Sequence, residues 1–572
     1  MKTAHRFLTC FLVIFIGCGV YAKSNNNYPQ NYFRNPLNIP LQLAANFGEV
    51  RPNHFHMGFD IRTQGRENLP VHAAADGYIS RIKIEKWGYG RAIYITHPNG
   101  YTTVYGHLNN FYPALDKYVK QQQYASTSWE QDIIFSPQQF PVSKGDFIAF
   151  SGNTGGSAGP HLHFEIRDTK TENCLNPRLF GFDIPDKIAP VIYSLYWYDR
   201  RYSTYQLGPN KINILRKGND YISAQKTVKV GSPLLSLGIY AEDKSSNSPF
   251  MFGIYGASLY MDNVLLNSFA LDDFSYPDSR YVNACIDYST YIKSKMPIQY
   301  LCILPGNQLP VFDDENNNGT IMLTDTLPHK IRLVVKDAAG NESTLITNIQ
   351  YSAALQKDYA FTMNSVALTP GKENSIEGEN VKAVFPEPDF YDVVPFVLNE
   401  QPIKGKAKAS SLIQLHNQYV PVDDSFSVQI KTTLPVNDPL RNHVVMYKIT
   451  GAHKEANKGQ WIGDWMQAKF NRLGTFQLLI DTIPPVVTPL GWKSGAVFTA
   501  QKFLKLRCKD ELDEIEVFTA SLDGQWLMFG KKDDDFIYEF DEHCPPGQHE
   551  LTVTATDIAG NISVKKFSFT RK

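Results

Sequence analysis

The sequence lacks an excess of charge of either sign. Its 572 residues hold 56 Lys and Arg against 57 Asp and Glu, so the formal net charge is −1. Proteins that bind nucleic acid usually carry a clustered basic surface, and no basic stripe interleaved with aromatic residues is found. We therefore expect no nucleic-acid partner.

Long hydrophobic runs are scarce. The apolar run Phe7–Val20 follows Lys2 and Arg6 and is short for a helix that spans a bilayer. It predicts a signal peptide over residues 1–22, cleaved after about Ala22. An uncleaved anchor is one alternative, and a lipoprotein attached through Cys18 is another. No second run is long enough for a transmembrane segment, so we expect an exported protein of the periplasm or cell envelope.

Cysteines are few, and none forms a Cys-x-x-Cys pair, which argues against a thiolate zinc site or a thioredoxin-like centre. The five that follow the signal peptide are Cys174, Cys285, Cys302, Cys508 and Cys544. An exported protein can form disulfides, and their positions make Cys285–Cys302 and Cys508–Cys544 candidate pairs. The odd number leaves at least one free thiol or a pair between chains.

Aromatic residues, by contrast, are abundant at 13% of the chain, which favours β structure. Short alternating strands between Gly, Asn, Asp and Pro turns fill the chain beyond residue 186. Seams at residues 186–192, 349–359 and 481–487 divide the chain, and the first and last of them contain proline. We predict an all-β protein with units at residues 23–185, 186–352, 353–485 and 486–572.

Two segments nearly repeat each other: KIRLVVKDAAGNES and HELTVTATDIAGNIS. In each, an alternating strand leads into Asp-x-Ala-Gly-Asn, with Asp337 and Asn341 in the first copy and Asp557 and Asn561 in the second. The repeat predicts the same turn twice and indicates tandem β-sandwich modules. They resemble bacterial immunoglobulin-like domains, whereas residues 353–485 are β-rich without this signature.

An acidic and Asn-rich segment in the first of these modules has the spacing of a calcium loop. Oxygen-bearing side chains fall at Asp314, Asn316 and Asn318, Gly319 follows, and Asp325 closes the segment. The alternative is an Asn- and Gly-rich hairpin turn, and no flanking helices are evident.

The segment GPHLHFEIR contains two candidate residues for a metal-binding or catalytic site. Leu162, Phe164 and Ile166 alternate with His161 and His163, which predicts a strand with one face on a core and both histidines on the other side. A His-x-His pair alone is weak evidence of a metal site, because surface strands often carry histidine.

Three more candidates precede this pair in residues 23–185. HFHMGFD places His56 four positions before Asp60, and His107 ends another alternating strand. Catalytic zinc takes three protein ligands and leaves one position for water, and imidazole nitrogen and carboxylate oxygen suit this ion. Additional histidines could move protons. His72 and His97 are better explained as structural residues.

These motifs, in this order, resemble the lysostaphin-type M23 zinc metallopeptidases, also called LytM-domain endopeptidases. The resemblance covers about residues 45–168. It implies a small antiparallel β domain with Zn²⁺ held by His56, Asp60 and His163, and His107 and His161 as catalytic histidines. His54, which forms a second His-x-His with His56, is interpreted as a supporting or surface residue.

The resemblance implies a zinc endopeptidase that cleaves the peptide cross-links of peptidoglycan, of D,D-endopeptidase type, so that peptidoglycan stems are the partner. The alternatives are a non-catalytic envelope-binding or activating module and a protease for protein substrates. Residues 112–141 form a longer link than the family pattern leads us to expect, and they either line the groove or form a surface insertion. All candidates for chemistry lie in residues 23–185, so we expect a chain truncated near Asp186 to keep hydrolytic chemistry if it folds.

Overall fold

The computed structural model describes residues 28–572, except residues 219, 247, 314–317, 360–364, 403–404, 406, 513–514 and 533. The predicted signal peptide and Cys18 lie outside the described residues, as do Asp314 and Asn316 of the candidate calcium loop. Within the described part, no helix has the length and apolar character needed to cross a membrane. The chain is built mainly from antiparallel sheets, as predicted.

The N-terminal domain is built on one large sheet. Its strands run in the order β1 (Leu43–Ala45), β4 (Phe59–Arg62), β13 (His161–Asp168), β8 (Tyr101–Gly106), β7 (Arg91–Thr96), β6 (Gly77–Ile84) and β10 (Gln131–Ile134), and β11 (Pro141–Val142) also pairs with β6. A second sheet has the order β5 (Pro70–His72), β12 (Phe147–Ser151) and β9 (Leu108–Phe111). The hairpin β2 (Val50–Arg51) and β3 (His54–Phe55) leads into β4.

Strand β13 is the predicted alternating strand, and it lies between β4 and β8. Leu162, Phe164 and Ile166 are fully buried in the domain core, as their alternation predicts. The opposite face differs from the prediction, because Glu165 is 0% exposed and His163 only 6% exposed. The first module behind the domain covers part of this face, which is why the polar side of the strand is not a surface.

The first module (residues 186–352) has two facing sheets. One has the order β16 (Asn210–Ile212), β15 (Val191–Asp199), β20 (Leu234–Glu242) and β24 (Gln299–Tyr300). The other has the order β17 (Ile214–Lys217), β18 (Asp220–Ser223), β27 (Glu342–Tyr351), β26 (His329–Lys336), β21 (Gly256–Met261) and β22 (Val264–Ala270). Helices α2 (Val282–Cys285) and α3 (Tyr288–Ser294) lie between the strands.

The N-terminal domain and the first module share both a sheet and a core. Strand β14 (Cys174–Leu175) pairs with β13 on one side and with β23 (Asp273–Phe274) of the module on the other. Phe47, Phe55 and Met57 of the N-terminal domain belong to the hydrophobic core of the first module. The seam near residue 186 therefore divides the sequence, but it does not separate two independent cores.

The segments predicted as the middle module (residues 353–485) and the last module (residues 486–572) each contain two larger sheets. In the middle module, one sheet has the order β29 (Asn374–Glu377), β30 (Val381–Phe385), β34 (Phe426–Lys431), β38 (Trp465–Phe470) and β37 (Gln460–Ile462). The other sheet has the order β32 (Leu398–Gln401), β33 (Leu412–Leu415), β39 (Gly474–Ile480), β35 (Val444–Thr450) and β36 (His453–Asn457). In the last module, one sheet has the order β40 (Val486–Pro489), β42 (Phe503–Lys509), β46 (Asp535–Glu539) and β45 (Gly530–Lys532). The other sheet has the order β41 (Ala496–Phe498), β48 (Ile562–Arg571), β47 (Gly547–Asp557), β43 (Ile515–Leu522) and β44 (Gln525–Trp526). Each core is separate and hydrophobic.

The two Asp-x-Ala-Gly-Asn segments form the same turn, which confirms the prediction from the repeat. In both, the backbone N–H of the Asn donates to Oδ1 of the Asp at 2.8 Å: Asn341 to Asp337 and Asn561 to Asp557. The Asn side chain then donates to Oδ2 of the same Asp. The two modules are thus built alike at the turn that follows β26 and β47.

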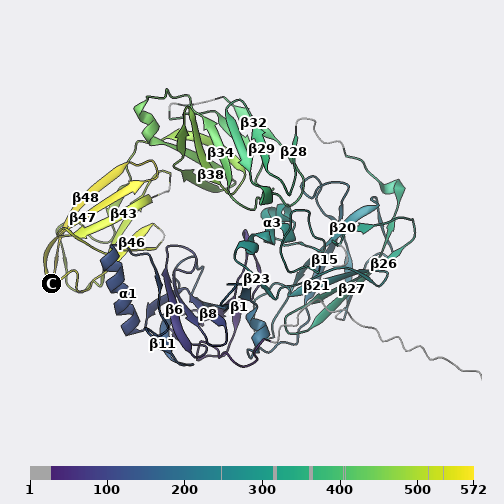
Figure 1. Cartoon of the computed structure of the whole chain (residues 1–572), viewed down its shortest axis with the longest axis horizontal. Coiled ribbons are helices and arrows are strands. Elements are labelled where there is room, and N and C mark those ends of the chain that lie inside the picture. The colour runs from purple at the N-terminus through teal and green to yellow at the C-terminus, as the bar shows by residue number, and fades with distance from the viewer. Residues whose placement is uncertain are drawn as a thin grey trace, which may run out of the picture.

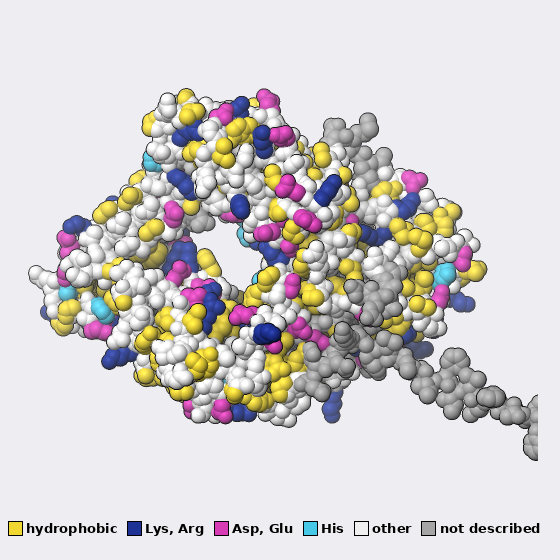
Figure 2. All heavy atoms as spheres, viewed as in Figure 1, with side chains coloured by type: hydrophobic (Ala, Val, Ile, Leu, Met, Phe, Trp, Pro, Cys, Tyr) yellow, Lys and Arg dark blue, Asp and Glu magenta, His cyan; other side chains and the backbone are white. Residues whose placement is uncertain are grey.

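The four units form a ring around a central opening (Figures 1 and 2). Helix α1 (Pro113–Ser126), from the predicted insertion, closes the ring against the last module. The Lys120 ammonium lies 2.5 Å from Asp541, and the ring of Tyr124 stacks on His543 with centroids 3.5 Å apart. Residues 112–141 therefore connect the two ends of the chain.

The predicted disulfides are wrong, because all five described cysteines are buried free thiols. Cys285 and Cys302 lie in one core, but the Cys285 sulfur takes the side-chain amide of Asn307 as its polar neighbour, at 3.5 Å. Burial raises the pKa of the Cys285 thiol to about 12. Burial also raises the pKa of Cys508 and of Cys544 to about 11. Thiols that stay protonated in an apolar core are unreactive.

Candidate metal centre

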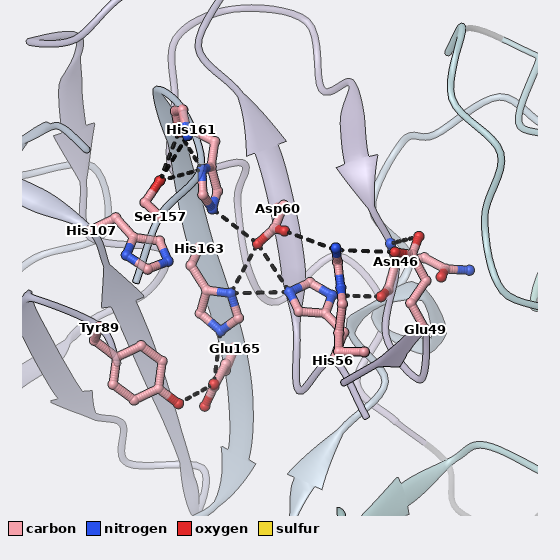
Figure 3. A network of polar contacts seen from close by, with 12 residues as sticks. Asn46, Glu49, His56, Asp60, Tyr89, His107, Ser157, His161, His163 and Glu165 are labelled. Carbon is pink, nitrogen blue, oxygen red and sulfur yellow. Dashed lines mark hydrogen bonds and ion pairs between the residues drawn. The ribbon is translucent and has the colours of Figure 1, made fainter. Parts of the chain in front are cut away.

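Three predicted ligands converge at the centre of the main sheet (Figure 3). Nε2 of His56 lies 3.0 Å from Oδ1 of Asp60 and 3.2 Å from Nδ1 of His163, and this Nδ1 is 3.0 Å from the same Oδ1. Asp60 on β4 and His163 on β13 are directly opposite in register, so the strand pairing itself places them together. His56 enters from the short connection between β3 and β4.

The outer nitrogen of each ligand histidine is held by an acceptor. Nδ1 of His56 donates to the carbonyl oxygen of Asn46 at 2.7 Å, and Nε2 of His163 donates to Oε1 of Glu165 at 2.8 Å. A histidine that donates from one ring nitrogen presents the bare lone pair of the other. The inner nitrogens, Nε2 of His56 and Nδ1 of His163, therefore face each other beside Asp60, where a metal ion could take the place of a proton.

This donor set fits a zinc ion. Two nitrogens and one carboxylate oxygen are ligands that zinc prefers, and donor atoms about 2 Å from a tetrahedral ion lie roughly 3.3 Å apart. Burial opposes charge on His163, but hydrogen bonds to Asp60 and Glu165 prevail and raise its pKa to about 9. Burial also opposes charge on Asp60, yet its pKa lies well below the usual range because the histidines surround it. A cation bound here would replace the proton on His163.

The two predicted catalytic histidines lie beside the three ligands. Nδ1 of His107 donates to the carbonyl oxygen of Thr154 at 2.8 Å, and Nδ1 of His161 donates to that of Gly159 at the same distance. Their rings lie 4.7 Å apart between centroids. Nε2 of His161 approaches only Asp60 among the three ligands, at 3.3 Å, so the donor geometry favours His163 over His161 as the metal ligand.

His107 is held in a strained conformation and kept neutral. Its φ of 58° is in the left-handed region, which few residues other than glycine adopt. Burial and the neighbouring His163 and His161 lower its pKa to about 3. Thr154, whose carbonyl oxygen accepts from His107, lies where the backbone segments at Gly90 and Gly155 pass close to each other. A Cβ on either glycine would lie within 2.4 Å of an atom of the opposite segment. Both glycines also have positive φ.

A family model identifies this part of the chain. Residues 54–133 match the model of Peptidase family M23. The chain contains an M23 peptidase domain. Residues 365–481 match a second model, that of a Zu5-like domain, which falls in the β-rich stretch for which the sequence suggested no signature.

The relatives named here each match only part of this chain. The DD-carboxypeptidase/endopeptidase Mpg of Neisseria meningitidis is 38% identical over 112 residues, which is 20% of either protein. The peptidoglycan DD-endopeptidase ShyA of Vibrio cholerae is 27% identical over 152 residues, 26% of this chain and 29% of ShyA. The catalytic domain of lysostaphin from Staphylococcus simulans is 21% identical over 24% of this chain and 89% of that domain, with a TM-score of 0.19. The chain thus spans less than a third of the length of Mpg and of ShyA.

The M23 peptidase domain carries a groove of about 900 Å³ above the ligands. His54, His56, His107, His161 and His163 are among the lining residues. No described residue of the segment 112–141 lines it, so of the two alternatives for this insertion the structure excludes the one in which it lines the groove. Ser275, Tyr276 and Pro277 of the first module line the groove instead.

Tyr276 contacts the carboxylate that supports His163. Its hydroxyl donates to Oε1 of Glu165 at 2.6 Å and also meets the hydroxyl of Tyr89. Arg167 pairs with the other oxygen of Glu165 at 2.8 Å. Neither Glu165 nor Tyr276 was among the predicted site residues. The sequence held a signal for Glu165, which follows His163 by two positions on the same side of the strand, but none for Tyr276.

Proposed function

We propose that this chain is a zinc endopeptidase that cleaves the peptide cross-links of peptidoglycan, with a D,D-endopeptidase specificity. The observation that carries the proposal is the convergence of His56, Asp60 and His163 at the base of an open groove, with His107 and His161 beside them. The names of Mpg and ShyA support peptidoglycan as the substrate. The predicted signal peptide supports export to the periplasm or cell envelope.

His56, Asp60 and His163 would hold the zinc ion. When bound, zinc would supply an activated water and polarise the carbonyl of the scissile bond. Glu165 and the Asn46 carbonyl would keep both ligand imidazoles oriented. Because all three side chains come from one face of the domain, the metal would be open on the side of the groove.

His107 and His161 would handle protons. Each donates from Nδ1 to a backbone carbonyl, so each presents a bare Nε2. A neutral imidazole of this kind can take a proton from the attacking water and pass it to the leaving amine. The left-handed backbone of His107 supports such a role, because strain of this type concentrates at functional sites.

Two other functions compete with this proposal. A non-catalytic binding module would not need two further histidines with fixed tautomers beside a complete ligand set. A protease for protein substrates would use the same centre, and the groove geometry does not distinguish peptide stems from proteins. The products of digestion separate all three functions.

The test is digestion of purified, cross-linked peptidoglycan with the zinc-loaded mature protein, followed by mass spectrometry of the muropeptides. We expect cross-linked dimers to become monomers whose stems keep their length. Shortened monomer stems would instead indicate a carboxypeptidase. His161→Ala, with its zinc retained, is the control, and a wild-type protein no more active than this variant would contradict the proposal. Cleavage of a protein panel without change in peptidoglycan would identify a protease.

A further inference from the structure

Three buried aspartates meet where the middle module joins the last one. Asp481 follows β39, Asp510 follows β42, and Asp557 ends β47. Each offers a carboxylate oxygen, and these oxygens all lie within 4.8 Å of one another. The residues are only 4%, 8% and 0% exposed. Three carboxylates so close and so deeply buried repel one another and require a compensating charge.

Two of these carboxylates are incompletely satisfied. Asp481 accepts from the backbone N–H of Ile483 through Oδ1, and Asp510 accepts from that of Leu512 through Oδ2. The other oxygens, Oδ2 of Asp481 and Oδ1 of Asp510, are buried and have no hydrogen-bond donor among the described residues. A buried ionised oxygen without a donor is costly unless a cation meets it.

No basic side chain supplies that charge in the described structure. None of the three aspartates has an ion pair within 4.0 Å there, and Glu511 adds a fourth acidic group against Asp481. Lys458 is the nearby cation, but its ammonium donates to backbone carbonyl oxygens, including that of Ala559 at 2.7 Å. One lysine held by carbonyls leaves most of the acidic charge unbalanced.

The corresponding place in the first module provides a comparison within the same chain. Asp186, Asp243 and Asp337 form an equivalent cluster, with Asp337 in the same turn as Asp557. There Arg178 of the peptidase domain lies 3.7 Å from Asp186. The first cluster therefore receives a guanidinium, while no basic side chain of the described residues forms an ion pair with the second cluster.

We infer that Asp481, Asp510 and Asp557 bind a calcium ion at the junction between the middle and last modules. Calcium is a hard cation that takes six to eight oxygen ligands in a flexible geometry, and three carboxylates with water match that requirement. Magnesium demands a closer octahedral arrangement and gives up its water reluctantly. The absence of nitrogen and sulfur donors from these three residues argues against zinc at this position.

The ion would set the angle between two modules. The residues around the cluster belong to both sides of the junction: Val445 and Ala456 of the middle module pack with Ala559 of the last module. The last module also carries Asp541 and His543, which contact α1 of the peptidase domain. Calcium at this junction would therefore stiffen the arm that closes the ring.

The test is calcium binding by the zinc-loaded mature chain, measured by calorimetry with CaCl₂ and by metal analysis after gel filtration. We expect one calcium ion per chain in addition to zinc. Asp510→Asn should weaken calcium binding at least about tenfold, because the site loses one of its charges. Asp534→Asn, at an exposed aspartate of the same module that pairs with Lys509, is the matched control and should bind as the wild type does.

Thermal melts provide an independent measurement. A ligand that binds only the folded state raises its melting temperature, so calcium should stabilise the wild type and Asp534→Asn but not Asp510→Asn. In calcium-free buffer, Asp510→Asn should melt above the wild type, because one repelling charge is gone. If Asp510→Asn does not fold, Glu511→Gln at the exposed fourth acid should still reduce calcium affinity.

Three results would overturn the inference. The first is a wild-type chain that binds no calcium at millimolar concentration. The second is equal calcium affinity in Asp510→Asn and Asp534→Asn. The third is magnesium binding as tight as calcium binding. None of them bears on the zinc centre, whose activity is measured separately.

Discussion

Nε2 of His163 lies 2.8 Å from Oε1 of Glu165, so the central histidine of the candidate metal centre is supported by a carboxylate that is fully buried. Burial opposes ionisation of Glu165, but Arg167 and His163 outweigh it and lower the pKa of this carboxyl. Tyr89 and Tyr276 also donate to it. The ligand His163 is therefore oriented by a network that extends into the first module.

Glu165→Gln should weaken zinc binding by about 10- to 100-fold while the fold is retained, because partners of this kind orient the ligand and increase its basicity. Competition with a zinc chelator measures the affinity. The matched control is Glu172→Gln, an exposed glutamate that lies 3.6 Å from the same Arg167. Equal affinity in the two variants would show that Glu165 does not support the metal.

Alanine at the five site residues should divide them into two groups. His56→Ala, Asp60→Ala and His163→Ala should lose zinc and activity together, because each removes a donor. His107→Ala and His161→Ala should keep zinc and lose about 10²- to 10⁴-fold in turnover, the usual contribution of acid–base catalysis. Metal analysis and muropeptide release are the two measurements. A zinc-free His161→Ala with zinc-loaded His163→Ala would reverse the assignment within the pair.

A chain that ends near Asp186 should be unstable, so it should not meet the condition of folding on which the sequence-based expectation of retained chemistry rests. Phe47, Phe55 and Met57 would lose the core of the first module, and each buried apolar side chain of this size contributes about 1.5–3 kcal/mol. Circular dichroism melts measure the effect. A chain that ends at residue 352 keeps this core and Tyr276, and it is the control. A short chain as stable and active as the longer one would contradict the shared core.

The ring should open when its closing contact is removed. Lys120 and Asp541 are partly exposed, and such pairs contribute at most about 1 kcal/mol and are screened by salt. We expect the double variant Lys120→Ala and Tyr124→Ala to increase the maximum dimension measured by small-angle X-ray scattering, and high salt to have a smaller effect of the same sign on the wild type. Lys117→Ala, on the exposed side of α1, should leave the dimension unchanged.

Asp243→Asn should stabilise the first module at alkaline pH only. Burial and the neighbouring Asp337 raise the pKa of Asp243 from 3.8 to about 7. A raised carboxyl pKa means that the folded state holds the proton more tightly, so wild-type stability falls as pH rises from about 4 to about 7. The gain on substitution is therefore near zero at pH 4 and at most about 4 kcal/mol at pH 8. Urea unfolding at the two pH values measures it, with exposed Asp220→Asn as the control; an equal gain at both pH values would contradict the assignment.

The candidate residues of the metal centre could be predicted from the sequence because each lies in a short motif, whereas the meeting of His163 with Asp60, 103 positions apart, depends on strand pairing. Asp60 and His163 face one another through strand pairing, and the alternation of β13 separates its ligands from its core residues. The repeated turns at Asp337 and Asp557 were equally predictable, since each closes on itself within five residues. Patterns of this kind follow from backbone geometry, which neighbouring residues determine.

Contacts between distant segments decided the rest, and these depend on how whole modules pack. The support of Glu165 by Tyr276 joins residues 111 positions apart, and the contact of Lys120 with Glu542 joins residues 422 positions apart. No periodicity records such a pairing. The free cysteines have the same cause, because the packed cores bury each thiol instead of linking it to another. The sequence by itself identified the candidate residues of the metal centre, and the tertiary structure decided what surrounds and supports them.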